Sequence, residues 1–330
     1  TARAGGVLFP VVNSLCEAFE SRPGPSAKRI GSFLMSAVFH CDIVVSAMFL
    51  TSMAANPLAA DLAAKTVGAE ITWVRWAIAA MVPGIVGIFV TVLVIYHRLC
   101  PPEIKRTPEA KDLAIRELTK MGPMSLREKM MLGVFVLSLV LWATASFTKF
   151  EATQVALLAV CVMLFADVIQ WEDVLQEQKA WDTLIWMGSV VCIAGFLNSS
   201  GFIEWFTSRV GTHLQGLPWT LALVVAFLVY LYSHYAFASM TAHVTAMYAA
   251  LVAIAVAAGA PVFLAAFAIA ISANVCGCLT HFGTGPAPIY YGAGYIDQST
   301  WWRNGFVMSI VHVVTWLGIG GAWWKVLGYW

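Results

Sequence analysis

The chain has 330 residues, of which 60% are hydrophobic and only 11% are charged, with a formal net charge of +1 and a mean hydropathy of +0.78. A soluble domain is about 45–50% apolar and about 25% charged, and one soluble core stops growing at about 250–300 residues, so this composition predicts a polytopic membrane protein. The weak net charge argues against a nucleic-acid-binding protein, the high apolar fraction against a disordered chain, and seven cysteines, mostly in apolar runs, against a disulfide framework.

The first residues, Thr1-Ala2-Arg3-Ala4-Gly5-Gly6, contain neither a methionine nor a signal-peptide pattern. We therefore expect the chain to be N-terminally truncated. An apolar segment over 32–62 follows, interrupted at Asn56-Pro57, and residues 72–96 form an uninterrupted candidate span. A transmembrane helix needs about 20 apolar residues, so the shorter apolar runs are expected to be tilted, broken or re-entrant.

Residues 97–129 form the one long polar stretch of the sequence and hold eight of its nineteen Lys and Arg residues. The positive-inside rule predicts that such a basic linker lies on the cytoplasmic side of a membrane, or on the equivalent side in an organelle. Its individual residues are expected to form a solvated loop without a further role.

Apolar segments resume after the linker at 130–147, 153–169, 183–200, 217–237, 242–258, 262–292 and 303–325. Between two of these segments lie the polar residues Ser239, Thr241 and His243, and each flanking arm is about long enough to enter a membrane and return. We interpret this region as a re-entrant hairpin, because a histidine in lipid is costly unless it faces a cavity. The alternative is a continuous span whose hydroxyl groups bond back to the helix backbone.

The elements before and after the linker follow the same order. Each half has a short polar sequence, at Thr1 and at Thr241, then an apolar arm, an interrupted segment and a full span. The interruptions, at Thr51–Pro57 and Thr280–Pro286, occupy matching positions, which indicates an inverted-repeat secondary transporter with its substrate near the membrane midplane. Free N–H groups at the start of a half-helix favour anions. The expected division is the remainder of a first repeat over 1–96, the basic linker over 97–129, and a second repeat over 130–330 with a hairpin tip at 239–241 and a broken helix at 280–288.

Short runs spread over essentially the whole chain resemble the divalent anion:sodium symporter family. They are Thr1–Gly6, Ser46–Thr51, Ala180–Thr183, His234–Ser239, Leu279–Pro286 and Trp323–Gly328. Within that family they resemble the branch that holds bacterial citrate/succinate and tartrate carriers and the plastidic 2-oxoglutarate/malate translocator. The resemblance implies an all-α, dimeric carrier with re-entrant hairpins and broken helices, whose binding domain moves like an elevator against a fixed scaffold.

Members of that family have a Ser-Asn-Thr motif at the tip of each of two hairpins, and these motifs bind substrate carboxylates. Thr1 resembles the threonine of the first motif, and Ser239-Met240-Thr241 occupies the second, with Met240 where the pattern has asparagine. This departure argues against an intact sodium site at the second tip. The residues expected to bind substrate, from the tips and the broken-helix loops, are Thr1, Arg3, Thr51, Asn56, Pro57, Ser239, Thr241, His243, Thr284, Gly285 and Pro286; no catalytic or metal-binding residue is predicted.

Arg3 and His243 stand at equivalent positions, each two residues after a tip threonine. Sodium-coupled members offset the charge of a dianionic substrate with bound cations, and an arginine and a histidine can supply that charge from the protein. We therefore hypothesise a sodium-independent exchanger of malate, succinate, 2-oxoglutarate, citrate or tartrate that needs no cofactor. The alternative is a symporter that uses Na⁺; in a purely structural interpretation, Arg3 snorkels to an interface and His243 bonds a backbone carbonyl. Further candidates for functional ionisable residues are Asp42 beside His40, Asp167, Asp182, His234 and His281, of which His281 is the strongest because it lies in the second broken loop.

An intramembrane enzyme is a remote alternative, because the sequence has no His-Glu-x-x-His, Gly-x-Ser-x-Gly or phosphate-binding glycine loop. The expected partners are small carboxylate anions, a lipid bilayer and a second copy of the chain. The expected location is a bacterial plasma membrane, with a plastid inner envelope as the alternative. Cys276 and Cys278 form a Cys-x-Cys sequence, which alone is a weak metal-binding signal, and we expect them to be small core residues. The tryptophans at span ends are expected to form an aromatic belt: Trp73, Trp76, Trp301, Trp302, Trp323 and Trp324.

Overall fold

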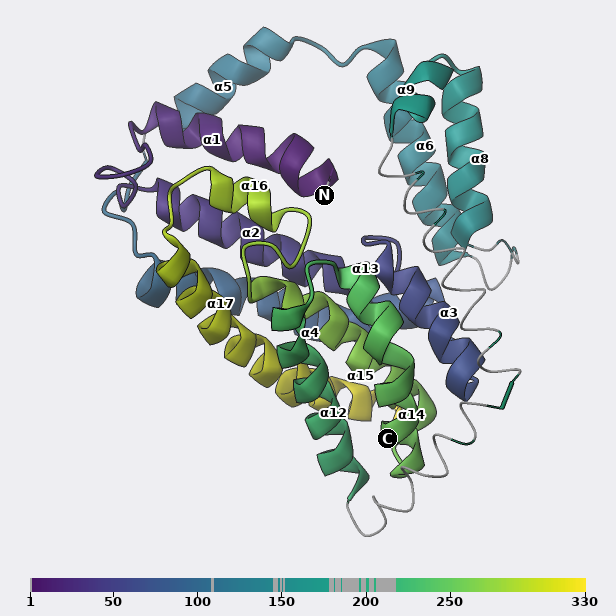
Figure 1. Cartoon of the computed structure of the whole chain (residues 1–330). Helices are drawn as coiled ribbons and strands as arrows, with labels where there is room; N and C mark the ends of the chain where they lie inside the picture. The colour runs from purple at the N-terminus through teal and green to yellow at the C-terminus, as the bar shows by residue number, and fades with distance from the viewer. Residues whose placement is uncertain are drawn as a thin grey trace. The chain divides into compact units, whose positions relative to one another are not determined.

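The computed structural model describes residues 2–107, 110–144, 152–177 and 218–330, together with isolated positions between 148 and 205. The chain divides into two compact units, one of residues 1–103 and 187–330 and the other of residues 104–186. All regular elements in the described ranges are helices (Figure 1). Five helical stretches, most of them made of consecutive elements, are long and apolar enough to cross a membrane: Gly31–Met48, Trp73–Leu99, Trp219–Ala236, Met240–Ala257 and Gln298–Val326. The prediction of an all-α polytopic fold is therefore confirmed, while the apolar run at 183–200 falls almost wholly outside the described residues.

The first part of the larger unit consists of helices that run back and forth between two ends of the unit. They are η1 (Ala2–Leu8), α1 (Phe9–Ala18), α2 (Gly31–Met48), α3 (Ala55–Val67), α4 (Trp73–Val94) and η2 (Ile95–Leu99). Helix α2 ends at Phe49, whose backbone is extended, and α3 starts six residues later at Ala55. The interruption predicted near Asn56-Pro57 is therefore a break between two helices, followed by the uninterrupted span of α4.

The second part of the larger unit repeats this order. Its elements are α12 (Trp219–Ser233), η3 (His234–Ala236), α13 (Met240–His243), η4 (Val244–Tyr248), α14 (Ala249–Ala257), α15 (Val262–Val275), η5 (Cys276–Cys278), α16 (Ala287–Gly292), α17 (Gln298–Val313), η6 (Val314–Gly320) and α18 (Gly321–Val326). The chain between η5 and α16 has no regular structure, so this half also contains a broken helix followed by a long one. A π-helical segment follows the tip position in both halves, at η1 and at η4.

Helices α12 and α14 pack together as the two arms of a hairpin, and both pack on α15. Two buried hydrogen bonds attach the arms to that helix. The Ser272 hydroxyl donates to the Phe227 carbonyl at 2.9 Å, and the Tyr248 hydroxyl donates to the Ala266 carbonyl at 2.8 Å. The structure thus has a helix–break–helix hairpin, rather than one continuous helix, around residues 237–239.

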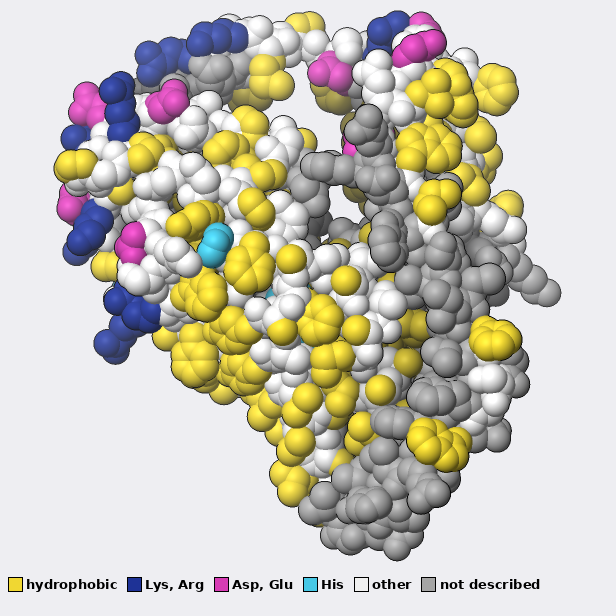
Figure 2. Space-filling model, viewed as in Figure 1, with side chains coloured by type: hydrophobic (Ala, Val, Ile, Leu, Met, Phe, Trp, Pro, Cys, Tyr) yellow, Lys and Arg dark blue, Asp and Glu magenta, His cyan; other side chains and the backbone are white. Residues whose placement is uncertain are grey.

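In the two halves, the ends of the hairpin helices far from the tip lie at opposite ends of the larger unit. The loop after α1 contacts the loop before α17, where the Tyr295 hydroxyl donates to the Ser21 carbonyl at 3.0 Å. The start of α12 lies at the other end, where Trp219 stacks edge-on against Trp330 at the chain's C-terminus. Charged side chains gather at the first end, and exposed apolar side chains cover the faces of α12 and α17 (Figure 2). This opposite placement is the arrangement that an inverted repeat requires.

The aromatic-belt prediction is wrong for three of the tryptophans at the span ends. Trp76, Trp301 and Trp324 are at most 4% exposed, so they cannot face lipid headgroups. The indole N–H of Trp76 donates to the Ala47 carbonyl, and that of Trp324 donates to the Ala79 carbonyl, both at 2.9 Å. These side chains instead join α4 to α2 and to the last helix, because a buried indole needs an internal acceptor.

The smaller unit contains α5 (Ala110–Met121), α6 (Leu126–Ala143), α8 (Ala152–Phe165) and α9 (Trp171–Gln176), with α6 packed on α8. The segment predicted as a solvated loop, 97–129, therefore includes a helix. Ser125 and Glu128 form a capping box at the start of α6, and hydrogen bonds from the Ser125 backbone N–H and then its hydroxyl hold the pKa of the Glu128 carboxyl below its ordinary value.

His312 lies fully buried on α17, and within the described part of the chain neither of its ring nitrogens has a hydrogen-bond partner. Since an unsatisfied buried polar group costs about 1–3 kcal/mol, His312→Leu is expected to stabilise the protein by about 1 kcal/mol. A higher thermal unfolding midpoint of the purified protein in detergent would confirm this expectation. His97→Leu is the control, because His97 is exposed, and an unchanged or lower midpoint for His312→Leu would contradict the prediction.

Candidate functional site

The tip of the α12–α14 hairpin is a short extended stretch between two helical arms. Phe237 has an extended backbone, and Ser239 caps α13 by accepting a hydrogen bond from the Ala242 N–H at 3.4 Å. Met240 is buried, whereas Ser239 is exposed and Thr241 is half-buried. The tip therefore presents the hydroxyl groups of Ser239 and Thr241, while the methionine side chain packs inside the protein.

The second broken helix lies directly against this tip. A Cβ atom placed on Gly277 would lie 3.3 Å from the Met240 Cε and 3.4 Å from the Thr284 Cγ2, so the tip and the break meet at this glycine. Gly285 is exposed next to Thr284, and Pro286 is buried before α16. The structure thus brings together the predicted residues of the second tip and those of the second break.

A buried hydroxyl of the second break is left without a partner. Thr280 is 0% exposed, and its Oγ1 makes no hydrogen bond to any residue that the structure describes. Because leaving such a group unsatisfied costs about 1–3 kcal/mol, a bound polar group or water is the expected partner. The sequence placed Thr280 in the broken loop but did not single it out as a binding residue.

The side-chain amide of Asn56 links the two helices on either side of the first break. Its Nδ2 donates to the Ser46 carbonyl at 2.9 Å and to the Phe49 carbonyl at 3.0 Å, both at the end of α2. Its Oδ1 accepts a hydrogen bond at 2.7 Å from Asn274 on α15. Asn56 therefore connects the two broken helices through buried side chains. Thr51, in the same break, accepts a hydrogen bond from the Trp73 indole at 3.2 Å.

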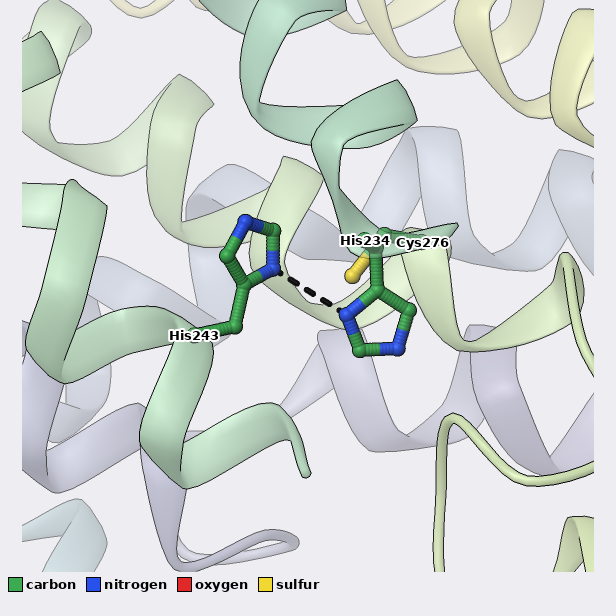
Figure 3. Close-up of side chains that lie close together, drawn as sticks. All are labelled: His234, His243 and Cys276. Carbon is green, nitrogen blue, oxygen red and sulfur yellow. Dashed lines mark hydrogen bonds between the residues drawn. The ribbon is translucent and has the colours of Figure 1, made fainter. Parts of the chain in front are cut away.

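Two histidines connect the tip to the second break (Figure 3). The Nδ1 atoms of His234 and His243 lie 3.1 Å apart, and the Nε2 of His234 lies 3.0 Å from the Gly283 carbonyl oxygen. His243 is stacked between aromatic rings, with centroid distances of 4.0 Å to Tyr230 and 4.3 Å to Phe237. A chain of contacts thus runs from the predicted site residue His243 to the loop that carries Thr284, Gly285 and Pro286.

The remaining predicted residues differ in what the structure says of them. Thr1, Asp182 and the side chain of Arg3 lie outside the described part of the protein. Pro57 is half-buried beside Asn56 on α3. His281 accepts a hydrogen bond from the Trp302 indole at 3.0 Å, so that contact already fixes its ring.

Asn274 was not predicted to belong to this region, while His234 was predicted only as one of several intramembrane ionisable candidates and Cys276 only as part of a Cys-x-Cys sequence. In the sequence each is a polar or small residue in an apolar run. The contacts that place it in this region mostly join parts of the chain that are distant in sequence. The one available signal was the pairing of His234 with His243 on either side of the predicted tip. Both cysteines of the Cys-x-Cys sequence are buried, as expected of core residues.

A separate cleft of about 590 Å³ lies at the charged end of the larger unit. Its lining includes Lys28, Asp297 and Arg303, next to Cys100 and Tyr295. None of the predicted binding residues lines it. The cleft is therefore distinct from the region where the tip and the breaks meet.

Comparison with known proteins identifies a family over the full length of the chain. The family model described as "Sodium:sulfate symporter transmembrane region" matches residues 1–330. The chain is 50% identical over 331 residues to the Bacillus subtilis protein named "Putative malate transporter YflS", covering 100% of this chain and 69% of that protein.

Plant plastid proteins are similar over the same range. The chain is 44% identical to "Dicarboxylate transporter 1, chloroplastic" of Arabidopsis thaliana, covering 100% of this chain and 60% of that protein. It is 39% identical to "Dicarboxylate transporter 2, chloroplastic" of Spinacia oleracea, covering 99% of this chain and 59% of that protein. The chain thus spans about three fifths of the length of these two relatives.

Proposed function

The chain belongs to the family described as the sodium:sulfate symporter transmembrane region, and on that premise we propose that the protein is a secondary carrier of dicarboxylate anions. Membership confirms the resemblance to the divalent anion:sodium symporters. The names of the bacterial and plastid relatives, which refer to malate and to dicarboxylates, support the substrate class. The observation that carries the proposal is the meeting of the hairpin tip, Ser239–Thr241, with the broken loop, Thr284–Pro286.

The substrate carboxylate binds, in this proposal, where hydroxyl groups and backbone N–H groups converge. Ser239 and Thr241 offer exposed or half-buried hydroxyls at one side, and the loop around Thr284 and Gly285 offers a turn of backbone at the other. Irregular backbone within a membrane protein is tolerated only where it is buried or lines a polar cavity. No covalent chemistry is required of these groups, so we regard the protein as a transporter and not as an enzyme.

We further propose that transport is an exchange of dicarboxylates without sodium. Met240 supplies a thioether at the position where the family motif has an asparagine oxygen, and hard cations prefer oxygen ligands. His243 lies buried at the same tip as a neutral ring, so in this proposal Arg3 supplies the positive charge that opposes the dianion. A carrier with fixed charge is costly to reorient without its anion, which favours obligatory exchange over net uptake.

The charged end of the larger unit supports an orientation in the membrane. Four basic side chains are exposed there: Arg22, Lys28, Arg98 and Arg303. Arg98 is part of the basic linker, and the linker contacts Lys28 because the Glu103 N–H donates to the Lys28 carbonyl. By the positive-inside rule this end faces the cytoplasm or its organellar equivalent. A bacterial plasma membrane is the proposed location, a plastid inner envelope the alternative, and a homodimer moving as an elevator the proposed working unit.

Counterflow in proteoliposomes tests the exchange mechanism. The full-length protein is reconstituted with unlabelled malate inside, and uptake of labelled malate is measured with and without sodium. We expect internal malate to stimulate uptake several-fold and the replacement of sodium by potassium or choline to leave the rate unchanged. Liposomes loaded with chloride are the control for net uptake. Strict dependence on external sodium would overturn exchange and favour symport, while the absence of any saturable uptake would overturn the carrier.

A further inference from the structure

Three side chains with metal-binding atoms converge behind the hairpin tip (Figure 3). His234 comes from η3, His243 from α13, and Cys276 from η5 next to the second break. The Cys276 sulfur and one ring nitrogen of each histidine lie within 4.8 Å of one another, and all three residues are buried. The cluster thus joins both arms of the hairpin tip to the broken helix.

The hydrogen bonds around the histidines fix which ring nitrogens carry protons. The Nε2 of His234 faces the Gly283 carbonyl, which can only accept, so Nε2 carries the proton. The Ser233 hydroxyl donates to the Tyr230 carbonyl at 2.9 Å, so it accepts from the Nε2–H of His243, also at 2.9 Å. Both neutral rings therefore hold their single proton on Nε2.

Both Nδ1 atoms are then bare lone pairs that face each other across 3.1 Å. Two such lone pairs repel unless a cation lies between them. Metal-binding histidines have the same outer hydrogen bonds, because an acceptor on the far nitrogen holds the tautomer and the ring orientation. The arrangement around His234 and His243 is thus oriented for a shared cation.

The distances match those of a zinc-class ion. Tetrahedral zinc binds imidazole nitrogen at about 2.0–2.1 Å, which places two such nitrogens about 3.3 Å apart, close to the observed separation. A thiolate bound to the same ion lies about 3.5 Å from each nitrogen, which is within the 4.8 Å that separates the three ligand atoms at most. The Cys276 thiol donates only a long 3.4 Å hydrogen bond to the Ala273 carbonyl, so the side chain can rotate toward the histidines at little cost.

We propose that His234, His243 and Cys276 form a binding site for a zinc-class divalent ion, with water as the fourth ligand. Because the ligands come from the hairpin tip and from the broken helix, the bound ion ties these two elements together. In this proposal, substrate release separates the tip from the break, so the ion inhibits transport by holding the two elements together. The inhibition, but not the site itself, rests on the proposed transport function.

Binding is tested on the purified full-length protein without substrate. Equilibrium dialysis against Zn²⁺ measures the stoichiometry, and Cd²⁺ reports on the cysteine through the ultraviolet charge-transfer band of a cadmium–thiolate bond. We expect a single ion per chain and a thiolate band that is lost in Cys276→Ser, with affinity lowered about tenfold or more. Cys278→Ser is the matched control, since Cys278 is equally buried but donates to the Gly305 carbonyl on α17.

Inhibition is tested on counterflow with the same variants. Zn²⁺ should slow exchange by the native protein and by Cys278→Ser, and it should leave Cys276→Ser unaffected at equal folded protein. Absence of Zn²⁺ binding would overturn the site and indicate that a proton bridges the histidines. Equal loss of binding in both cysteine variants would also overturn it. Binding without any slowing would overturn the tie between tip and break, whereas binding by a protein that transports no dicarboxylate would leave the site standing and refute the carrier.

Discussion

Replacing Gly305 by alanine is expected to destabilise the protein by about 3 kcal/mol and to abolish dicarboxylate exchange by the fraction that still folds. A Cβ atom at this position would lie 2.4 Å from the Cys278 carbonyl oxygen and 2.8 Å from the Leu279 carbonyl oxygen. Both contacts are with backbone, which cannot rotate away as a flexible side chain can. Helix α17 must therefore move away from the start of the second break, and the loop that carries Thr284 loses its position.

Gly318→Ala is the control for this prediction. Gly318 lies on the same long helix, in η6, and nothing lies within 4 Å of the position where its Cβ would stand. Alanine there should leave both the thermal midpoint in detergent and the counterflow rate close to those of the native protein. If Gly305→Ala unfolds at the native midpoint and exchanges malate at the native rate, then the close approach of α17 to the break has no functional weight.

The overall plan of the fold was predictable from the sequence because breaks in apolar runs carry a physical signal. Proline and polar residues inside apolar segments predicted interruptions at Thr51–Pro57 and Thr280–Pro286, which overlap the breaks at 49–54 and 279–286. The length of the apolar runs predicted full spans where the structure has α4 with η2 and α17 with η6 and α18. The order of these elements predicts an inverted repeat. The sequence could not indicate which residues are buried. Trp76 and Trp324 stand at span ends, as tryptophans of an interfacial belt do, but they lie inside the protein because distant helices pack around them.

The candidate site was predictable only in the parts that the chain brings close in sequence. Ser239, Thr241 and His243 stand within one tip, and Thr284 to Pro286 within one loop, so their grouping followed from local pattern and family resemblance. The contacts of His234 with Gly283 and of Asn56 with Asn274 join residues that are 49 and 218 positions apart. No periodicity encodes such pairs, since either partner alone looks like an ordinary buried polar side chain in an apolar helix.

The Asn56–Asn274 contact leads to the second large prediction, that Asn56→Leu is far more damaging than Asn274→Leu. Leucine at 56 removes one donor from each of the Ser46 and Phe49 carbonyls, which keep the Ser52 hydroxyl as a donor, and it removes one acceptor of the Asn274 side chain. Three lost hydrogen bonds at about 0.5–1.5 kcal/mol each give a loss of roughly 2–4 kcal/mol, which is a substantial part of a typical folding free energy. Thermal unfolding in detergent, without substrate, measures the loss independently of any role in binding.

Asn274→Leu costs less folding free energy than Asn56→Leu. The Asn274 Nδ2 donates only to the Asn56 Oδ1 and the Ala270 carbonyl, and its Oδ1 has no partner among the described residues. A loss of about 1 kcal/mol is expected, and the double variant should be less unstable than the sum of the two single variants. Asn304→Leu, a buried asparagine whose only described hydrogen bond is a long one to the Cys100 sulfur, is the matched control and should change little. If the two variants at 56 and 274 prove equally mild, then the amide of Asn56 does not hold the first break. If instead Asn56→Leu collapses the protein while Asn274→Leu retains exchange, then the broken end of α2 depends on one side chain, and the first half of the site is shaped by that amide before any substrate arrives.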